Sequence, residues 1–392
     1  MKIFHTGDWH IGKLVNQVYM TEDQAYILDR LVELIAAEKP DALIIAGDVY
    51  DRAIPPVEAI ELLDRTLSRI VLELETPVLM VAGNHDSPDR LGFGSGILEA
   101  KGLHIEGRLR TEARRVTLHD GHGPVHFYLA PFAHPAEVRD VMGQAEVRDQ
   151  NAAMQAILGQ IQAAWNPAER NVLITHGFVR GVEEPELSES EKPLSYGEAL
   201  GGVEFVDAAL FDGFDYVALG HLHGPQRAGS DRIRYSGSLL KYSFSEVNQN
   251  KSLTVVTLGP KGEWQTELRR LQPLRDMRRI RGELAKLLEP AVYQAANRED
   301  YLHVSLTDEG ELWEPANQLR AVYPNFMSLE LAGRDKAAAT GKNAAAAGYK
   351  TKSKLEQFGE FYAAISGGEF DAAKQALLQE VLQEIEHSER SA

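Results

Sequence analysis

The 392-residue chain contains no cysteine, and this absence excludes several kinds of chemistry. Without thiol groups there can be no disulfide, no cysteine nucleophile, no cysteine-ligated zinc and no iron–sulfur cluster. A tightly held metal ion would have to be bound by His, Asp, Glu or Asn side chains. The lack of disulfides also fits a cytoplasmic protein.

Long apolar runs and an excess of positive charge are missing as well. No stretch of about 18 consecutive apolar residues occurs, so we expect no membrane-spanning helix. The segment Met1–Asp8 has too short an apolar run for a signal peptide. The chain carries 41 Lys and Arg against 58 Asp and Glu, a formal net charge of −17. This balance argues against broad nonspecific binding to nucleic acid or anionic lipid.

The hydrophobic pattern of the first two-thirds of the chain predicts a layered α/β fold. Short apolar runs alternate with amphipathic patterns such as residues 22–38, which we expect to be a helix. Strands alternating with helices indicate βαβ units. The expected strands are residues 2–5, 42–46, 78–82, 172–175, 216–219 and 253–258.

The remainder of the chain has a different character, and we expect four parts in all. Residues 1–272 form the α/β domain, and residues 273–333 read as a small α+β unit. Residues 334–354 are rich in Ala, Gly and Lys and predict a linker. Residues 355–392 show two apolar helical faces separated by Gly367-Gly368, which predicts a helical hairpin.

Polar residues gather where the predicted strands end, the place at which α/β sheets carry their sites. Each group alone is weak, because Gly-Asp or Asp-x-His after a strand is often only a turn. Their recurrence at successive strand ends favours a shared site. The residues, in strand order, are Asp8 and His10; Asp48 and Asp51; Asn84, His85 and Asp86; His176; and His221 and His223.

Seven of these side chains are suited to binding metal ions. Seven protein ligands suit two ions better than one, since an octahedral ion takes about six ligands that usually include water. A mixture of His, Asp and Asn favours manganese, iron or zinc over magnesium. The seven are Asp8, His10, Asp48, Asn84, His176, His221 and His223.

The ordered motifs resemble those of the calcineurin-like metallophosphoesterase superfamily. The runs HTGDWHIGK, GDVYDR, GNHDSP, GHLHGPQ and YSGSLLKYSFSE narrow the resemblance to DNA-repair nucleases within it. The motifs stand here as Asp8-Trp9-His10, Gly47-Asp48-Val49-Tyr50-Asp51, Gly83-Asn84-His85-Asp86, His176 and Gly220-His221-Leu222-His223.

The resemblance implies a fold and a ligand assignment. The core would be a layered β-sandwich flanked by helices, capped by the small α+β domain at residues 273–333. One ion, expected to be manganese, would take Asp8, His10, Asp48 and His223. The other would take Asp48, Asn84, His176 and His221, so that Asp48 bridges the two ions.

Such a site can hydrolyse a phosphodiester. Two cations lower the pKa of a bridging water, whose hydroxide attacks in line, and they neutralise charge on the phosphate oxygens. His85 is the motif residue outside the ligand set that can reach the site, and we expect it to act as general acid or to orient the phosphate, with Asp86 orienting its ring. The alternative is that His85 only supports a ligand. Asp51 is expected to orient a ligand rather than to bind metal.

The motifs alone fit phosphatases, nucleotidases, cyclic-nucleotide phosphodiesterases and nucleases alike. The resemblance implies an exonuclease on duplex DNA ends and an endonuclease on single strands or hairpins, acting in DNA repair, recombination and replication at the nucleoid. A small-substrate phosphoesterase and a binding scaffold with vestigial metal sites remain alternatives.

The resemblance also implies partners. Residues 355–392 would bind an SMC-like ATPase that supplies ATP binding, because this chain has no Gly-Lys-Ser/Thr phosphate loop. Residues 57–74 and 88–100 would form a homodimer within a heterotetramer.

Six arginines gather where the first two expected domains meet. They could contact DNA phosphates or pair with nearby acidic side chains, and the sequence leaves both open. Because the chain is acidic overall, we expect it to bind DNA weakly and with strong salt dependence on its own. The six are Arg269, Arg270, Arg275, Arg278, Arg279 and Arg281.

Overall fold

The computed structural model describes most of the chain. The predicted linker and most of the predicted helical hairpin lie outside the described residues. Among the described residues, no helix is both long and apolar enough to cross a membrane. The described residues are 1–191, 205–308, 312–332, 358–359, 362, 370–371 and 374–379.

Two six-stranded sheets form the body of the protein. In each sheet the central strands are parallel and carry antiparallel neighbours at one or both edges. The first sheet has the order β16 (Trp264–Arg270), β15 (Ser252–Leu258), β1 (Lys2–Thr6), β4 (Ala42–Ala46), β5 (Val78–Val81) and β6 (Leu103–Glu106). The second has the order β13 (Gln226–Ala228), β14 (Ser230–Tyr235), β12 (Tyr216–Gly220), β9 (Arg170–His176), β8 (Gly123–Ala130) and β7 (Arg114–Asp120).

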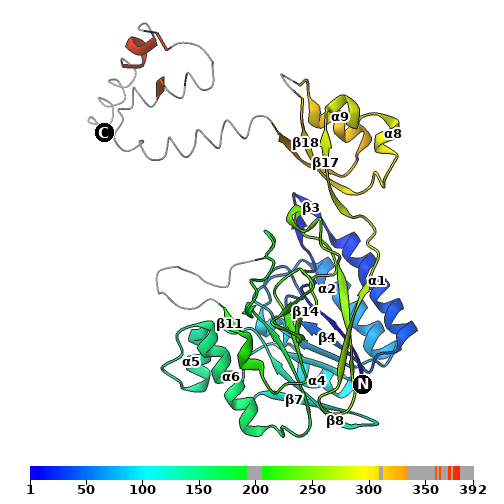
Figure 1. Ribbon diagram of the computed structural model, residues 1–392, viewed down its shortest axis with the longest axis vertical. Helices are drawn as coiled ribbons and strands as arrows, with labels where there is room; N and C mark the ends of the chain where they lie inside the picture. The colour runs from blue at the N-terminus through cyan, green and yellow to red at the C-terminus, as the bar shows by residue number, and fades with distance from the viewer. Residues whose placement is uncertain are drawn as a thin grey trace.

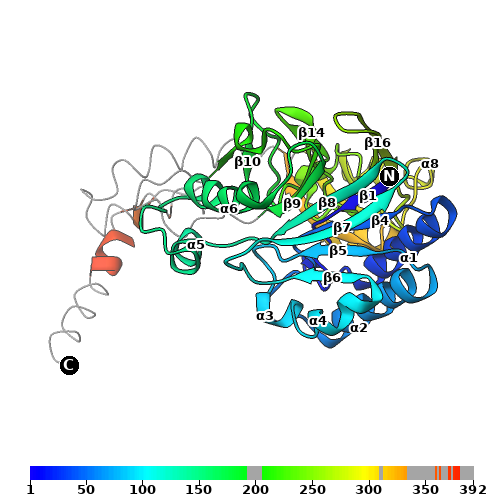
Figure 2. The same ribbon diagram turned by 90° about the horizontal axis from the view of Figure 1, so that it is seen from below.

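The two sheets pack face to face, as Figure 2 shows. Strand β4 contacts β9 and β12, and β5 contacts β8. Their inner faces share one apolar core that contains Ile44, Leu79, Phe127 and Val172. Because side chains alternate across a strand, the other face of each sheet needs its own apolar cover. The predicted β-sandwich is confirmed, and each expected strand coincides with an observed one, except that β5 ends at Val81, one residue earlier than expected.

Helices cover the outer faces of both sheets (Figure 2). Helices α1 (Thr21–Glu38) and α2 (Val57–Ser68), with the π-helical turn η1 (Arg69–Glu73), pack on the first sheet. Helices α5 (Pro135–Met142) and α6 (Gln150–Ala164) cover the second. The smaller elements are β2 (Leu14–Val15), β3 (Val18–Tyr19), α3 (Pro88–Leu91), α4 (Ser95–Leu98), η2 (Glu99–Lys101), β10 (Val179–Arg180), β11 (Val206–Asp207), η4 (Ala208–Phe211) and η5 (Phe244–Glu246).

A three-stranded unit follows the sandwich and lies at its β3 end in Figure 1. Its strands β17 (Met277–Gly282), β18 (Tyr301–Leu306) and β19 (Phe326–Leu331) are all parallel. Short helices α7 (Leu284–Leu287), α8 (Pro290–Tyr293) and α9 (Pro315–Val322) connect them and share their apolar core. The mixture of helices and strands expected after residue 272 is present, while the exact domain boundary stays a prediction.

The three-stranded unit is joined to the sandwich by polar contacts, of which that between Tyr301 and Asp23 is buried. Arg275 contacts Asp23 and Glu22 of α1, each at 2.7 Å. The Tyr301 hydroxyl donates to the same Asp23 carboxylate at 2.7 Å. Met277 and Tyr301 also belong to the apolar core of the first sheet. One of the six arginines therefore holds the two parts together.

Candidate metal centre

Both sheets contribute to one cluster of ligand-type side chains. Asp8, Asp48 and Asn84 follow β1, β4 and β5 of the first sheet, while His221 follows β12 and His176 ends β9 of the second. Because the central strands of both sheets end at the same side of the sandwich, their terminal loops meet there. The structure thus brings the predicted residues together from two sheets.

The cluster contains two separate groups of potential ligands and a third group, His10, Asp51 and His85, that shares His10 with the first. Atoms of Asp8, His10 and His223 lie within 4.8 Å of one another, and so do atoms of Asp48, His176 and His221. The Asn84 Oδ1 atom completes the second group.

That oxygen lies 2.9 Å from His176 Nε2 and 3.3 Å from His221 Nδ1. Asp48 Oδ2 lies 3.5 Å from His176 Nε2 and 3.7 Å from His10 Nε2. Asp48 is therefore placed between the two groups, where a shared ligand is needed.

Several of these atoms direct lone pairs at one another. His176 Nδ1 lies 3.0 Å from the Ala46 carbonyl oxygen, which can only accept, so Nδ1 carries the proton and Nε2 faces the Asn84 oxygen with a lone pair. His10 Nε2 and His223 Nε2 meet at 3.1 Å. Asp8 Oδ2 is buried without a hydrogen-bond partner. A cation would relieve each of these contacts, so the residues present fit bound metal ions.

Burial shifts the pKa values of the candidate ligands, and the shift favours the metal-binding form of the histidines but disfavours that of the two aspartates. Burial and the charge of Asp48 hold the pKa of Asp8 well above its usual range, and burial raises the pKa of Asp48 to about 6. Burial also lowers the pKa values of His176 and His223 to about 4. The histidines therefore stay neutral with free lone pairs, while the two carboxylates require compensating positive charge.

The backbone at the ligands is strained. Asp8, His10, Asp48 and His221 have φ angles of 52°, 45°, 48° and 114°. Such conformations cost about 1–3 kcal/mol each and persist only where the surroundings enforce them. Here the loops hold one another: Asp8 N donates to the Gly47 carbonyl at 3.0 Å, His10 N donates to the Asp48 carbonyl at 2.9 Å, and His221 N donates to Asp8 Oδ1 at 2.8 Å.

Two glycines of the motifs are required by close approach. A Cβ atom on Gly83 would lie 2.2 Å from Asp48 Oδ1, and one on Gly220 would lie 1.7 Å from the Ala46 carbonyl oxygen. Neither neighbour can move without displacing a strand end or a ligand. These glycines let the two sheets bring their ligands close together.

His85 lies at the edge of the cluster. Its Nδ1 atom donates to the Asp51 carbonyl oxygen at 2.7 Å, and its Nε2 atom lies 3.9 Å from Asp48 Oδ2. Its ring packs edge-on against the His10 ring, with centroids 4.7 Å apart. His85 therefore directs one ring nitrogen toward the cluster while its backbone N–H binds Asp48 Oδ1 at 2.8 Å.

Asp86 does not orient His85, contrary to the expectation from the sequence. Its carboxylate accepts from the backbone N–H groups of Val49, Tyr50 and Gly83 at 2.9–3.1 Å. The carbonyl of Asp51 orients the imidazole instead. Successive side chains in an extended turn point in different directions, so Asp86 fastens the two loops to each other.

Asp51 lies beside His10, and its expected role of orienting a ligand stays a prediction. Its Oδ1 atom lies 3.5 Å from His10 Nδ1 and 2.7 Å from the Lys13 ammonium group. Burial raises the pKa of Asp51, but His10 and Lys13 more than offset this and hold it well below its usual range. An ionised Asp51 can therefore orient the ring of His10.

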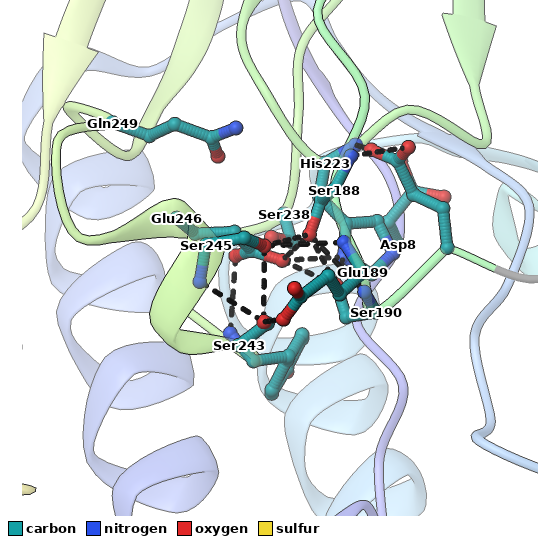
Figure 3. Close-up of polar contacts among 12 residues, drawn as sticks. Asp8, Ser188, Glu189, Ser190, His223, Ser238, Ser243, Ser245, Glu246 and Gln249 are labelled. Atoms are coloured by element: carbon teal, nitrogen blue, oxygen red, sulfur yellow. Dashed lines mark hydrogen bonds and ion pairs between the residues drawn. The ribbon is translucent and has the colours of Figure 1, made fainter. Parts of the chain in front are cut away.

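The structure shows a buried polar network that sequence reasoning missed. Glu246 is fully buried and contacts His223 Nδ1, with Ser188 and Ser190 beside it (Figure 3). Burial raises the pKa of Glu246, but Lys251 and His223 more than offset this and hold it well below its usual range. The only sequence signal was the run YSFSE, which had served solely to indicate the family.

Half of the arginine cluster is paired. Arg269 contacts Glu38 at 3.1 Å, Arg275 contacts Asp23 and Glu22, and Arg278 contacts Asp300 at 2.6 Å. Within the described part of the chain, no carboxylate lies within 4 Å of the other three. These are Arg270, Arg279 and Arg281, and all are exposed.

Comparisons with known proteins extend over most of the chain. Residues 1–225 match the family model of the calcineurin-like phosphoesterases, and residues 273–366 match that of the type 5 capsule protein repressor C-terminal domain. The SbcD subunit of nuclease SbcCD from Staphylococcus epidermidis is 36% identical over 329 residues, 84% of this chain and 85% of that protein. A dimetal phosphatase of Danio rerio aligns with 70% of this chain and 98% of its own, at 13% identity and a TM-score of 0.37.

Replacing Asp48 tests its position between the two groups. Asp48→Ala should abolish tight binding of both ions, because the substitution removes an oxygen from each group. Metal content after dialysis against Mn²⁺ measures the effect. Asp140→Ala, which removes an exposed carboxylate of α5 outside the cluster, is the matched control and should retain two ions. Retention of two ions by Asp48→Ala would exclude the bridge.

Proposed function

The chain belongs to the calcineurin-like phosphoesterase family, and on that basis we propose that it is a metal-dependent DNA nuclease of the SbcD type. The complete set of seven ligands, with His85 directed into the same cluster, is the observation that carries the phosphodiesterase activity. The SbcD subunit of nuclease SbcCD is 36% identical over 84% of this chain, and this similarity favours a nuclease within the family. We propose duplex exonuclease and single-strand or hairpin endonuclease activity in DNA repair, recombination and replication.

Manganese is the ion we propose for both positions, because the ligands mix imidazole with carboxylate and amide oxygen and include no sulfur. When bound, two such ions supply a water that is deprotonated near neutral pH and neutralise charge on the phosphate. The ligands are Asp8, His10, Asp48 and His223 for one ion and Asp48, Asn84, His176 and His221 for the other.

His85 is proposed as the general acid. The Asp51 carbonyl accepts from Nδ1–H and thereby keeps Nε2 directed at the cluster. From this position Nε2–H can donate a proton to the leaving oxygen of the phosphodiester, or hold a phosphate oxygen in place. The ring is only partly buried, so the reacting group can approach it.

The proposed role of His85 separates catalysis from metal binding. His85→Asn should retain two ions and lose about 10²–10⁴-fold in the rate of DNA cleavage, the usual contribution of a general acid. Metal content and cleavage rate are measured on the same preparation, with His122→Asn, an exposed histidine in the turn between β7 and β8, as control. Full cleavage activity with metal bound would rule out this role.

The substrate class is tested with end-labelled duplex DNA. The chain should release label with Mn²⁺ and stop when EDTA is added. Rapid hydrolysis of p-nitrophenyl phosphate without DNA cleavage would instead favour the alternative, a small-substrate phosphatase or nucleotidase.

The three-stranded unit is proposed as a cap that contacts DNA. Arg279 and Arg281 pair in register with His303 and Ser305, on the face of the sheet opposite the apolar core. The His303 ring lies 5.5 Å from that of Phe244, which belongs to the same short helix as Glu246. This polar face thus lies beside the short helix that carries Glu246, and its exposed arginines can bind phosphates.

A second copy of the chain is proposed to cover an apolar groove beside α2. The groove has a volume of 560 Å³ and is lined by residues of α2, η1 and the segment 90–105. Phe93, Leu72 and Ile60, which line it, are 85%, 60% and 47% exposed. Such a concentration of exposed apolar side chains is typical of an interface. It supports the homodimer expected at residues 57–74 and 88–100.

A charge placed in this groove should separate the copies. Phe93→Asp should convert a dimer to a monomer in light scattering coupled to size-exclusion chromatography. Val182→Asp introduces the same charge at a fully exposed residue outside the groove and should leave the dimer intact. A monomeric wild-type chain, or a dimeric Phe93→Asp variant, would contradict the assignment.

We further propose a partner for the C-terminal segment. Residues 355–392 would bind the coiled-coil base of SbcC, an SMC-like ATPase, so that ATP binding occurs on the partner. The family match over residues 273–366 and the similarity to one subunit of the nuclease SbcCD support this assembly. The complex would be a heterotetramer in the cytoplasm, associated with the nucleoid.

A further inference from the structure

We propose that Glu246 is the positioning residue of His223 and sets the tautomer in which His223 can bind a metal ion. This inference rests on the proposed metal centre. It adds a role for a side chain that lies outside the ligand set.

The ring of His223 is held from both sides. Its Nε2 atom points to the cluster, 3.1 Å from His10 Nε2. Its Nδ1 atom lies 3.2 Å from Glu246 Oε1 and 2.6 Å from Ser190 Oγ, and Ser190 Oγ in turn donates to the same carboxylate oxygen (Figure 3). A carboxylate only accepts, so Nδ1 carries the proton and Nε2 keeps its lone pair for a metal ion.

The backbone of His223 is fastened by the same network. Its N–H donates to Glu191 Oε1 at 2.8 Å, and its carbonyl accepts from Lys251 Nζ at 2.8 Å. Lys251 also contacts Glu246 Oε2 at 2.7 Å. Every polar atom of His223 except Nε2 thus has a partner in this network.

Two short segments with the same pattern build this network. Residues 188–191 and 243–246 both read Ser-x-Ser-Glu. They interlock, because Glu189 N donates to Ser245 Oγ at 3.1 Å and Ser188 Oγ donates to Glu246 Oε1 at 2.6 Å. Residues 188–191 come from the loop that follows β10, and residues 243–246 precede β15. Distant parts of the chain therefore meet on one ligand.

The hydrogen bonds of Glu246 dictate what an amide would do in its place. Its Oε2 atom accepts from Tyr242 N–H at 3.0 Å and from the Lys251 ammonium group, both of which can only donate. In Glu246→Gln the side-chain amide oxygen must therefore occupy the position of Oε2. The amide NH₂ group then faces His223 Nδ1 and favours the tautomer with the proton on Nε2, which cannot bind metal.

The test measures the tautomer and the metal affinity, neither of which depends on nuclease activity. In the metal-free full chain with ¹⁵N-labelled histidine, the NMR signals of His223, assigned with a His223→Asn variant, should report the Nδ1–H tautomer. In Glu246→Gln they should report the Nε2–H tautomer. Calorimetric titration with Mn²⁺ should show one of two ions weakened by about 10–100-fold.

A matched control separates this role from packing. Glu169→Gln makes the same substitution in a glutamate–histidine pair outside this network, where Glu169 lies 2.8 Å from His126 Nε2, and should leave the His223 tautomer and the metal affinity as in wild type. If Glu246→Gln does not fold, Glu246→Gln/Lys251→Met removes the buried ammonium group and keeps the Tyr242 N–H that orients the amide. This double variant is judged by the tautomer alone, because Lys251 also binds the His223 carbonyl.

An unchanged tautomer or unchanged affinity for both ions would overturn the proposal. A wild-type chain that binds no Mn²⁺ would reject the metal centre, and the tautomer measurement, made without metal, would still decide the role of Glu246.

Discussion

Repulsion among buried ligand groups, where the two sheets end, is the constraint on which the rest of the structure depends. Asp8 and Asp48 place two carboxylates almost out of solvent, and ring nitrogens of His10 and His223 meet with little room between them. Such an arrangement is unstable in isolation. It persists because strand ends, loop hydrogen bonds and buried partners fix every element that carries a ligand.

Three features of the structure offset this repulsion, and each acts on different atoms. The apolar core between the sheets fixes the strand ends. The fixed strand ends in turn hold the backbone of Asp8 and Asp48 in the left-handed conformation. Gly83 and Gly220 allow the loops to approach closely. The buried Asp86 accepts hydrogen bonds from N–H groups of the loops, and the buried Glu246 accepts one from Nδ1 of His223. The strain this stores is available for binding cations.

The charge distribution resolves an apparent conflict with a DNA substrate. A net charge of −17 describes the average surface and not the metal centre. Two divalent ions would add about four positive charges beside only two ligand carboxylates, Asp8 and Asp48. The exposed Arg279 and Arg281 add positive charge to the three-stranded unit, while Arg275 joins that unit to the sandwich.

The sequence pattern was enough to predict the strands and the ligand candidates, whereas the family resemblance supplied the sandwich. Each ligand follows directly on an apolar strand, so its position depends on local pattern and on the shared direction of parallel strands. The tautomer of His223, the role of Asp86 and the choice between paired and free arginines could not be predicted in this way. They depend on contacts between residues far apart in the chain, such as Glu246 with Ser190, and on side-chain directions that only packing determines. Local periodicity encodes which residues end a strand, whereas the protonation and orientation of those residues are decided by what the tertiary structure places against them.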